Sequence, residues 1–151
     1  MYSKILGGEI IMISANEFVL FYSEIFKYLD KNFGKKEVEK IWDGIRNNYC
    51  EGLKNIIKEK GLKGMHEYWS KVLSEEGGKY VLTLTDDEFI LDMHYCPSMG
   101  KLLSTHITPY EDYCGHCPAL FVKTIEECGF DAEHYSINSS TGECRLHIRK
   151  N

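Results

Sequence analysis

Residues 79–96 have the sequence KYVLTLTDDEFILDMHYC, in which the apolar residues change from helical spacing to a period of two. Such alternation over Lys79–Thr85 and Glu88–Cys96 is typical of two half-buried strands, with Asp86-Asp87 as the turn between them. We therefore predict a β-hairpin here. In its second strand one face is apolar, and the other carries a carboxylate, an imidazole and a thiol: Asp92, His94 and Cys96.

Three helices are predicted before this hairpin. The first follows a capping box at Ser14–Glu17 and ends at Gly34, the second runs from about Lys36 to Glu59, and the third from about Leu62 to Ser74. We interpret their aromatic stripes as packing surface between helices rather than as the lining of a ligand pocket. Residues 1–13 are expected to form a short arm or strand.

A helix and a second hairpin are predicted after residue 96. A loop or short helical turn follows Pro97, and a second capping box at Thr108–Glu111 predicts a helix that runs to Cys128. Ala132–Ser139 and Glu143–Arg149 have the pattern of two more strands.

The predicted fold class is therefore α+β. Three N-terminal helices precede a four-stranded, mainly antiparallel sheet in ββαββ order, with helices on one face. We predict a single domain over residues 1–151, made of a helical half (1–78) and a cysteine-bearing half (79–151).

The composition excludes several classes of protein. The 151 residues are 43% hydrophobic and 27% charged, as in ordinary soluble domains. A net charge of −5 argues against nucleic acid and anionic membrane surfaces as partners. No apolar run approaches the roughly 18 residues that span a bilayer, and the first residues do not have the pattern of a signal peptide. We expect a cytoplasmic protein; an apolar patch on the N-terminal helices could form a homodimer.

Six cysteines are many for such a chain, and five of them lie between residues 96 and 144. Because nothing indicates export, metal binding or thiol chemistry is a better interpretation than disulfides. Cys50 and Cys128 are expected to be core residues. Cys114 and Cys117 fall on one helical stripe, where Pro118 must either kink the helix or begin it. Cys144 shares a strand face with apolar residues and can meet this pair.

Three kinds of chemistry fit these thiols. A Cys-Gly-His-Cys motif has the spacing with which two thiolates chelate zinc, and the possible further ligands are Cys96, Cys144, His94 and His116. The same motif is typical of dithiol oxidoreductases, although the strand and later cis-proline of a thioredoxin site are missing. A single thiolate could instead act as a nucleophile, assisted by a histidine (His94 or His116) and an acid such as Asp92 or Asp112.

Residues 80–150 resemble a known family. The segments Tyr95-Cys96-Pro97, Tyr113–Cys117, Glu126–Phe130 and Gly142–Arg145 are similar to the pattern of the L-2-amino-thiazoline-4-carboxylic acid hydrolase-like family, and more distantly to 4-vinyl reductase-like domains. The resemblance implies a small α+β protein that hydrolyses, or descends from an enzyme that hydrolyses, a cyclic C–N/C–S substrate such as a thiazoline ring. The family positions best matched are Cys96, Cys114 and Cys144, with His116 and Cys117 a common extension.

The leading hypothesis is thus a small-molecule hydrolase-like enzyme. Its candidate catalytic residues are Cys96, Cys114, His116 and Asp92, and its candidate metal ligands are Cys96, Cys114, Cys117, Cys144 and His94, with zinc as the possible cofactor. The main alternative is a non-catalytic zinc- or ligand-binding sensor module, and a dithiol oxidoreductase ranks third.

Overall fold

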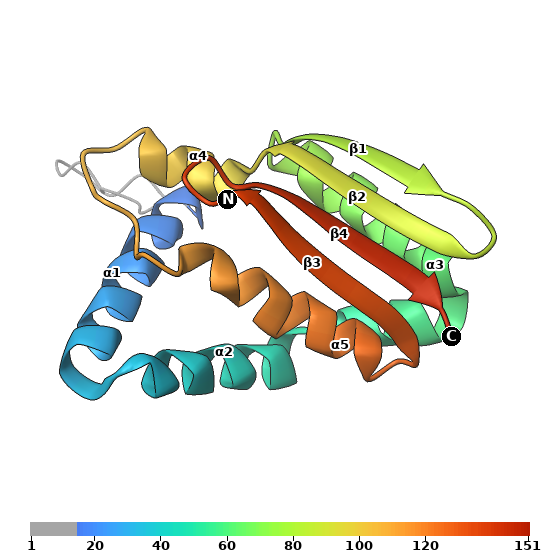
Figure 1. Ribbon diagram of the computed structural model, residues 1–151, viewed down its shortest axis with the longest axis horizontal. Coiled ribbons are helices and arrows are strands. Elements are labelled where there is room, and N and C mark those ends of the chain that lie inside the picture. The colour runs from blue at the N-terminus through green and yellow to red at the C-terminus, as the bar shows by residue number, and fades with distance from the viewer. Residues whose placement is uncertain (1–14) are drawn as a thin grey trace, which may run out of the picture.

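A computed structural model describes residues 15–151, with side chains from Glu17 onward. Helices at the N-terminus lead into an antiparallel sheet, and further helical segments separate its two hairpins (Figure 1). The arm expected at residues 1–13 and the cap at Ser14 lie outside the described residues. The elements are α1 (Ala15–Phe33), α2 (Lys35–Tyr49), α3 (Glu51–Glu75), β1 (Lys79–Leu84), β2 (Glu88–Tyr95), α4 (Pro97–Leu103), η1 (Tyr113–Gly115), η2 (Pro118–Val122), α5 (Lys123–Glu126), β3 (Phe130–Asn138) and β4 (Glu143–Lys150).

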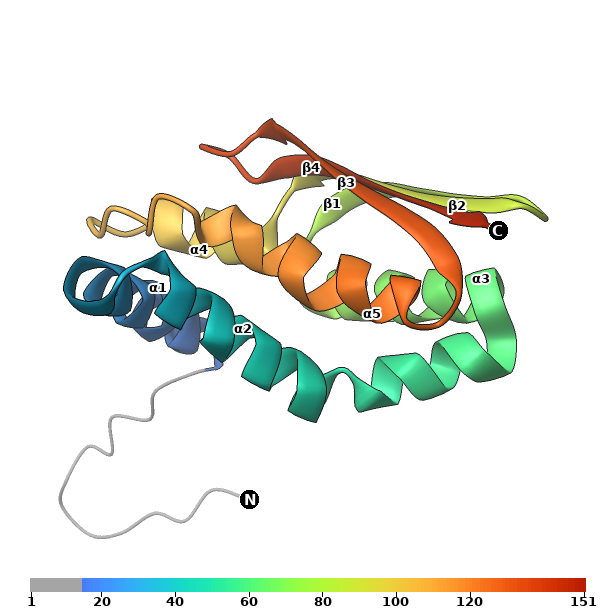
Figure 2. The same ribbon diagram turned by 60° about the horizontal axis from the view of Figure 1, so that its bottom comes forward.

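The sheet has the strand order β1-β2-β4-β3, and each neighbouring pair is antiparallel. Leu91 of β2 pairs with Leu82 of β1 on one side and with Leu146 of β4 on the other, so apolar residues meet across the inner face. Figure 2 shows the sheet on one side of the molecule and every labelled helix on the other. The predicted α+β fold, with both hairpins and helices on one face, is confirmed.

Two apolar clusters lie beneath the sheet. The larger joins the inner face of the sheet to α3 and α5, with Trp69 and Phe89 among its buried residues. The smaller lies between α1, α2 and α4 and includes Phe26 and Trp42. Cys96 packs against both clusters, so it stands at their junction.

The aromatic stripe of α1 is only partly used for packing. Phe26 is fully buried, whereas a second set of side chains is at least 49% exposed: Phe18, Phe21, Ile25 and Phe33. The interpretation of this stripe as packing surface between helices therefore holds for Phe26 but not for these four exposed side chains, and the predicted homodimer stays a prediction.

The second predicted helix, Lys36–Glu59, is wrong as a single element. The chain breaks at Cys50 (φ −82°, ψ 1°), between α2 and α3. The break has a physical reason: Trp42 belongs to the smaller cluster and Ile57 to the larger, and one straight helix would not serve both. The stop predicted at Gly61 is a kink inside α3, where φ is 56°.

The helix predicted from Thr108 begins later, at Tyr113, so the second capping box is wrong. The Tyr110 amide donates instead to Ser23 Oγ at 2.8 Å, and the Tyr110 hydroxyl donates to Asp30 Oδ2 at 2.8 Å. These bonds to α1 hold Tyr110 outside the helix. Pro118, which has no amide hydrogen, opens a π-helical turn in which Lys123 N–H donates to the Pro118 carbonyl.

Candidate functional site

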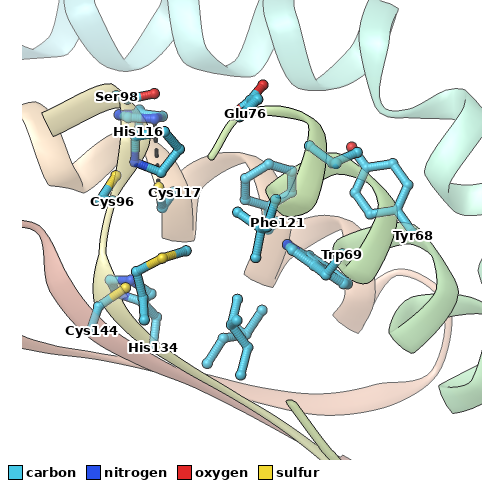
Figure 3. Close-up of a pocket in the computed structure, with 16 residues that line it drawn as sticks. Tyr68, Trp69, Glu76, Cys96, Ser98, His116, Cys117, Phe121, His134 and Cys144 are labelled. Carbon is cyan, nitrogen blue, oxygen red and sulfur yellow. Dashed lines mark hydrogen bonds between the residues drawn. The ribbon is translucent and has the colours of Figure 1, made fainter. Parts of the chain in front are cut away.

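A cavity of about 300 Å³ lies between the inner face of the sheet and the helices (Figure 3). Trp69 and Leu73 of α3 form one wall, and Leu91 and Leu146 of the sheet line it from the other side. Small-molecule sites in proteins begin at about this volume and are mostly apolar. The cavity therefore suits a compact, ring-sized ligand.

Three thiols and two imidazoles gather at one end of this cavity: Cys96, Cys117, Cys144, His116 and His134. Figure 3 shows them on one side of the cavity, with Tyr68 and Trp69 on the other. They come from the residue that follows β2, from the helical segment around Pro118, from β4 and from β3. Residues far apart in the sequence thus form one polar end on an otherwise apolar cavity.

A second cavity of about 20 Å³ adjoins this end. It is lined by both imidazoles and by four thiols: Cys96, Cys114, Cys117 and Cys144. Its volume is close to that of about one water-sized probe. The predicted meeting of Cys114, Cys117 and Cys144 is therefore confirmed, and Cys96 joins them.

Gly142 allows this convergence. It has a φ of 75°, and a Cβ atom there would lie 2.7 Å from Cys96 Cβ and 2.8 Å from Met99 Cβ. Only glycine fits both the left-handed backbone and this close approach. The β3–β4 turn can therefore lie directly on Cys96, and Cys144, two residues later, reaches the cluster.

Cys96 was predicted to share a strand face with Asp92 and His94, and this is wrong. β2 ends at Tyr95, next to an irregularity in its pairing with β1, and Cys96 caps α4 instead. The Gly100 amide donates to the Cys96 carbonyl at 2.8 Å, so Cys96 belongs to the start of α4 and not to β2.

Asp92 and His94 lie away from the cavities. Asp92 Oδ1 accepts a hydrogen bond from Arg145 Nε at 2.6 Å, in an ion pair between β2 and β4, and His94 is exposed. Neither lines either of the two cavities at the thiols. The structure therefore separates these two candidates from Cys96, Cys114 and His116.

His116 and Cys117 form a hydrogen-bonded pair. The His116 ring contacts the Tyr113 carbonyl through Nδ1, and its Nε2 lies 3.5 Å from Cys117 Sγ (Figure 3). A carbonyl oxygen can only accept, so Nδ1 carries the ring hydrogen and Nε2 of the neutral ring has a free lone pair. The Cys117 thiol is therefore the donor to Nε2.

Burial keeps this pair neutral. It raises the pKa of the Cys117 thiol to about 12 and lowers the pKa of His116, the latter partly offset by the bond to Tyr113. Burial also raises the pKa of Cys144 to about 12 and of Cys114 to about 11, and nearby Cys117 adds to both shifts. At neutral pH the cluster consists of thiols rather than thiolates.

Sequence reasoning missed His134 and the aromatic wall. His134 faces inward from β3, two residues after buried Ala132, and burial lowers its pKa. The two-residue alternation of β3 could have placed it there. Trp69 was assigned to plain packing, but it both packs in the core and lines the cavity.

The six cysteines all lie in the described part of the chain and are free thiols. Cys50 is buried and Cys128 packs against the larger cluster, as predicted for core residues. Within residues 15–151, no group of three or more His, Cys, Asp or Glu side chains is arranged to hold a metal ion. The zinc site predicted from the sequence stays a prediction.

Comparison with models of known protein families and with curated proteins finds no match for this chain. The resemblance described for residues 80–150 therefore stays a prediction as well. Across residues 15–151, the helices are too short or too polar to cross a membrane.

Proposed function

We propose that the protein is a small-molecule hydrolase in which Cys117 is the nucleophile and His116 is its general base. One observation carries this proposal: the Cys117 thiol contacts the unprotonated Nε2 of His116 at the end of an apolar cavity of about 300 Å³. A nucleophile, a base and a third group that orients the base are the recurring parts of such sites. The Tyr113 carbonyl is the orienting group.

The contacts favour Cys117 over Cys96 and Cys114. The Cys114 thiol donates weakly to the Ser139 carbonyl at 3.9 Å, and Cys114 lines only the smaller of these two cavities. Cys96 lines both cavities but packs between two apolar clusters. Cys117 lines the larger cavity and also has a base in contact.

The reaction begins when Cys117 Sγ attacks an electrophilic carbon while its proton passes to His116 Nε2. In a 2-aminothiazoline ring this carbon is C2: the Sγ–C2 bond forms, the ring C–S bond breaks, and the leaving sulfur takes the proton from His116. Water then attacks C2, gives a proton to His116, and the C2–Sγ bond breaks as Cys117 regains that proton. The net change is addition of one water to give a carbamoyl product with a free thiol.

We propose a cytoplasmic location, because thiols stay reduced in that compartment. The neutral pair also fits this chemistry, because a thiol that ionises only during attack needs its base in contact.

The test uses p-nitrophenyl acetate, an activated aromatic ester, and 2-amino-2-thiazoline. We expect a burst of nitrophenol with an acetyl group on Cys117, detected by mass spectrometry, and slow opening of the ring. Cys117→Ala and His116→Ala should lose the burst, whereas Cys128→Ala, outside both cavities, should keep it. A burst of equal size in Cys117→Ala would overturn the proposal.

A second candidate is the zinc- or ligand-binding module. Four thiols and two imidazoles line a cavity of about 20 Å³, and zinc prefers such ligands, but within residues 15–151 no three of them are arranged to hold a metal ion. Metal analysis of freshly purified protein tests it: about one zinc per chain, lost in Cys114→Ala, would support it, and metal-free protein that also fails to take up added zinc would overturn it.

A further inference from the structure

The residues that line the larger cavity carry charge of one sign only. Of the 16 residues that line the larger cavity, Glu76 is the one acidic residue, and none is Lys or Arg. The two histidines there are neutral at pH 7, because burial lowers the pKa of both. A bound ligand therefore meets one formal charge, and this charge is negative.

Glu76 has no cationic partner among the described side chains. Many other carboxylates of the chain form ion pairs: Glu67 with Lys60, Asp92 with Arg145 and Glu127 with Lys54. The pKa of Glu76 is raised, by burial and then by neighbouring Glu75, whereas the pKa of paired Glu127 is lowered. Glu76 is thus an exposed carboxylate that also lines the cavity, and a bound cation would stabilise it.

Glu76 lies directly after the end of α3, at the edge of the cavity. This helix end already carries partial negative charge. Glu76 lines the cavity together with Tyr68 at the aromatic end and Cys96 at the thiol end. In Figure 3 it lies across the cavity from Cys144 and His134.

The aromatic end adds a second attraction for a cation. Trp69 meets Phe121 edge to face with ring centroids 5.7 Å apart, and it meets Tyr68 in the same way at 5.2 Å. Aromatic faces attract organic cations, most strongly where water is excluded. A flat, delocalised cation fits such a wall better than a strongly hydrated ammonium group does.

We propose that the cavity selects a compact ring compound with an amidinium-type cation and no carboxylate, which Glu76 and the aromatic wall bind. This inference rests on the proposed function, because it names the substrate class of the same site. It departs from the carboxylate-bearing thiazoline of the resembled family: a ring carboxylate would meet Glu76 without a Lys or Arg in the lining to balance it.

The test measures binding of benzamidine, benzamide and benzoate, which have nearly the same shape and charges of plus one, zero and minus one. Calorimetry on full-length Cys117→Ala protein at pH 7 separates binding from turnover. We expect benzamidine to bind at least about tenfold more tightly than benzoate, with benzamide between them.

Glu76→Gln should reduce the preference for benzamidine to about twofold or less, and Glu76→Lys should reverse it in favour of benzoate. Glu75→Gln is the matched control, since Glu75 is adjacent in sequence but does not line the cavity; it should keep the preference. Circular dichroism confirms that each variant is folded.

Equal binding of the three compounds, or an unchanged preference in folded Glu76→Gln and Glu76→Lys proteins, would overturn the inference. These results are independent of the proposed chemistry. Selective binding of benzamidine without an acetyl adduct on Cys117 would contradict the proposed hydrolase and support the inference. An acetyl adduct on Cys117 together with equal binding of the three compounds would support the hydrolase and contradict the inference.

Discussion

The Cys117–His116 pair is two adjacent residues whose contact is fixed locally, by the turn of helix that also holds the His116 ring on the Tyr113 carbonyl. In many cysteine enzymes the nucleophile is already a thiolate before the substrate binds. Here burial favours the neutral thiol, so the chemistry depends on proton transfer during attack.

A first prediction concerns alkylation. With a pKa of about 12 instead of 9.0, the thiolate fraction of Cys117 at pH 8 is about a thousandfold smaller than that of a free cysteine. Iodoacetamide should therefore modify Cys117 far more slowly than a cysteine-containing peptide, with a rate that still rises above pH 10. Peptide mapping after timed alkylation measures this. Labelling of Cys117 at pH 7 as fast as that of the peptide would contradict the prediction.

A second prediction concerns the pH dependence of the burst with p-nitrophenyl acetate. Protonated His116 is unable to accept the thiol proton, so the burst rate should fall in acid. Because burial lowers the pKa of His116, the midpoint of this fall should lie below 6.5. His147→Gln is a control, since His147 bonds Glu88 at 2.7 Å outside the cavities and should leave the midpoint unchanged. A midpoint above 6.5 would contradict the assignment of His116 as base.

At the scale of elements, the features that depend on neighbouring residues could be predicted from the sequence. Both hairpins were predicted because alternation and turn residues lie within a few positions of each other. The break at Cys50 and the late start at Tyr113 depend on distant partners: two separate cores for α2 and α3, and Ser23 of α1 for Tyr110. The alternation of β3 could have placed His134 on the inner face, but a single sequence does not specify the strand register and the chain reversal that bring His134 and Cys96 to the same site.

The β3–β4 turn offers a matched test of close packing. Gly142 and Gly129 both have positive φ, of 75° and 88°, but a Cβ at Gly129 would have no atom within 4 Å. Gly129→Ala should therefore cost only the backbone strain, about 1 kcal/mol in the free energy of unfolding. Gly142→Ala adds a clash with Cys96 and Met99 and should cost about 2–4 kcal/mol.

Urea denaturation of the two glycine variants measures this difference. The acetyl burst provides a second readout, because displacement of the turn from Cys96 should disturb the thiol end of the cavity in Gly142→Ala alone. Equal losses of stability in the two variants would mean that the turn does not depend on close contact with Cys96.

At the scale of the molecule, the fold class could be predicted because the change from helical to two-residue period at Gly78 divides the chain cleanly. The site could be predicted only in part. The CxxC spacing placed Cys114 and Cys117 together, and the face of β4 added Cys144. The cavity itself arises where α3, the sheet and the Pro118 segment fail to fill the space between them, and a periodicity analysis of one element does not contain that information.

A last prediction concerns the stability of the whole molecule, because the cluster contains histidines with a lowered pKa and thiols with a raised pKa. Histidines with a lowered pKa bind fewer protons in the folded state than in the unfolded state below pH 6.5, so stability falls as the pH drops from there. Thiols with a raised pKa keep protons that the unfolded state loses above pH 9.0, so stability also falls as the pH rises from there. The free energy of unfolding should form a plateau between these limits, with slopes of up to about 1.4 kcal/mol per pH unit for each group.

Urea denaturation from pH 5 to pH 10.5 measures this profile. Replacing Cys117 and Cys144 together by alanine should reduce the alkaline slope and leave the acid side unchanged, with Cys114 still contributing. His134→Gln should reduce only the acid slope, with His116 still contributing. Ion-paired carboxylates with a lowered pKa, such as Glu127, lose their contribution only below about pH 4.5 and so fall outside this range. An alkaline slope that is unchanged after removal of both thiols would contradict the raised pKa values of Cys117 and Cys144, and the neutral-thiol state on which the proposed chemistry depends would lose its support.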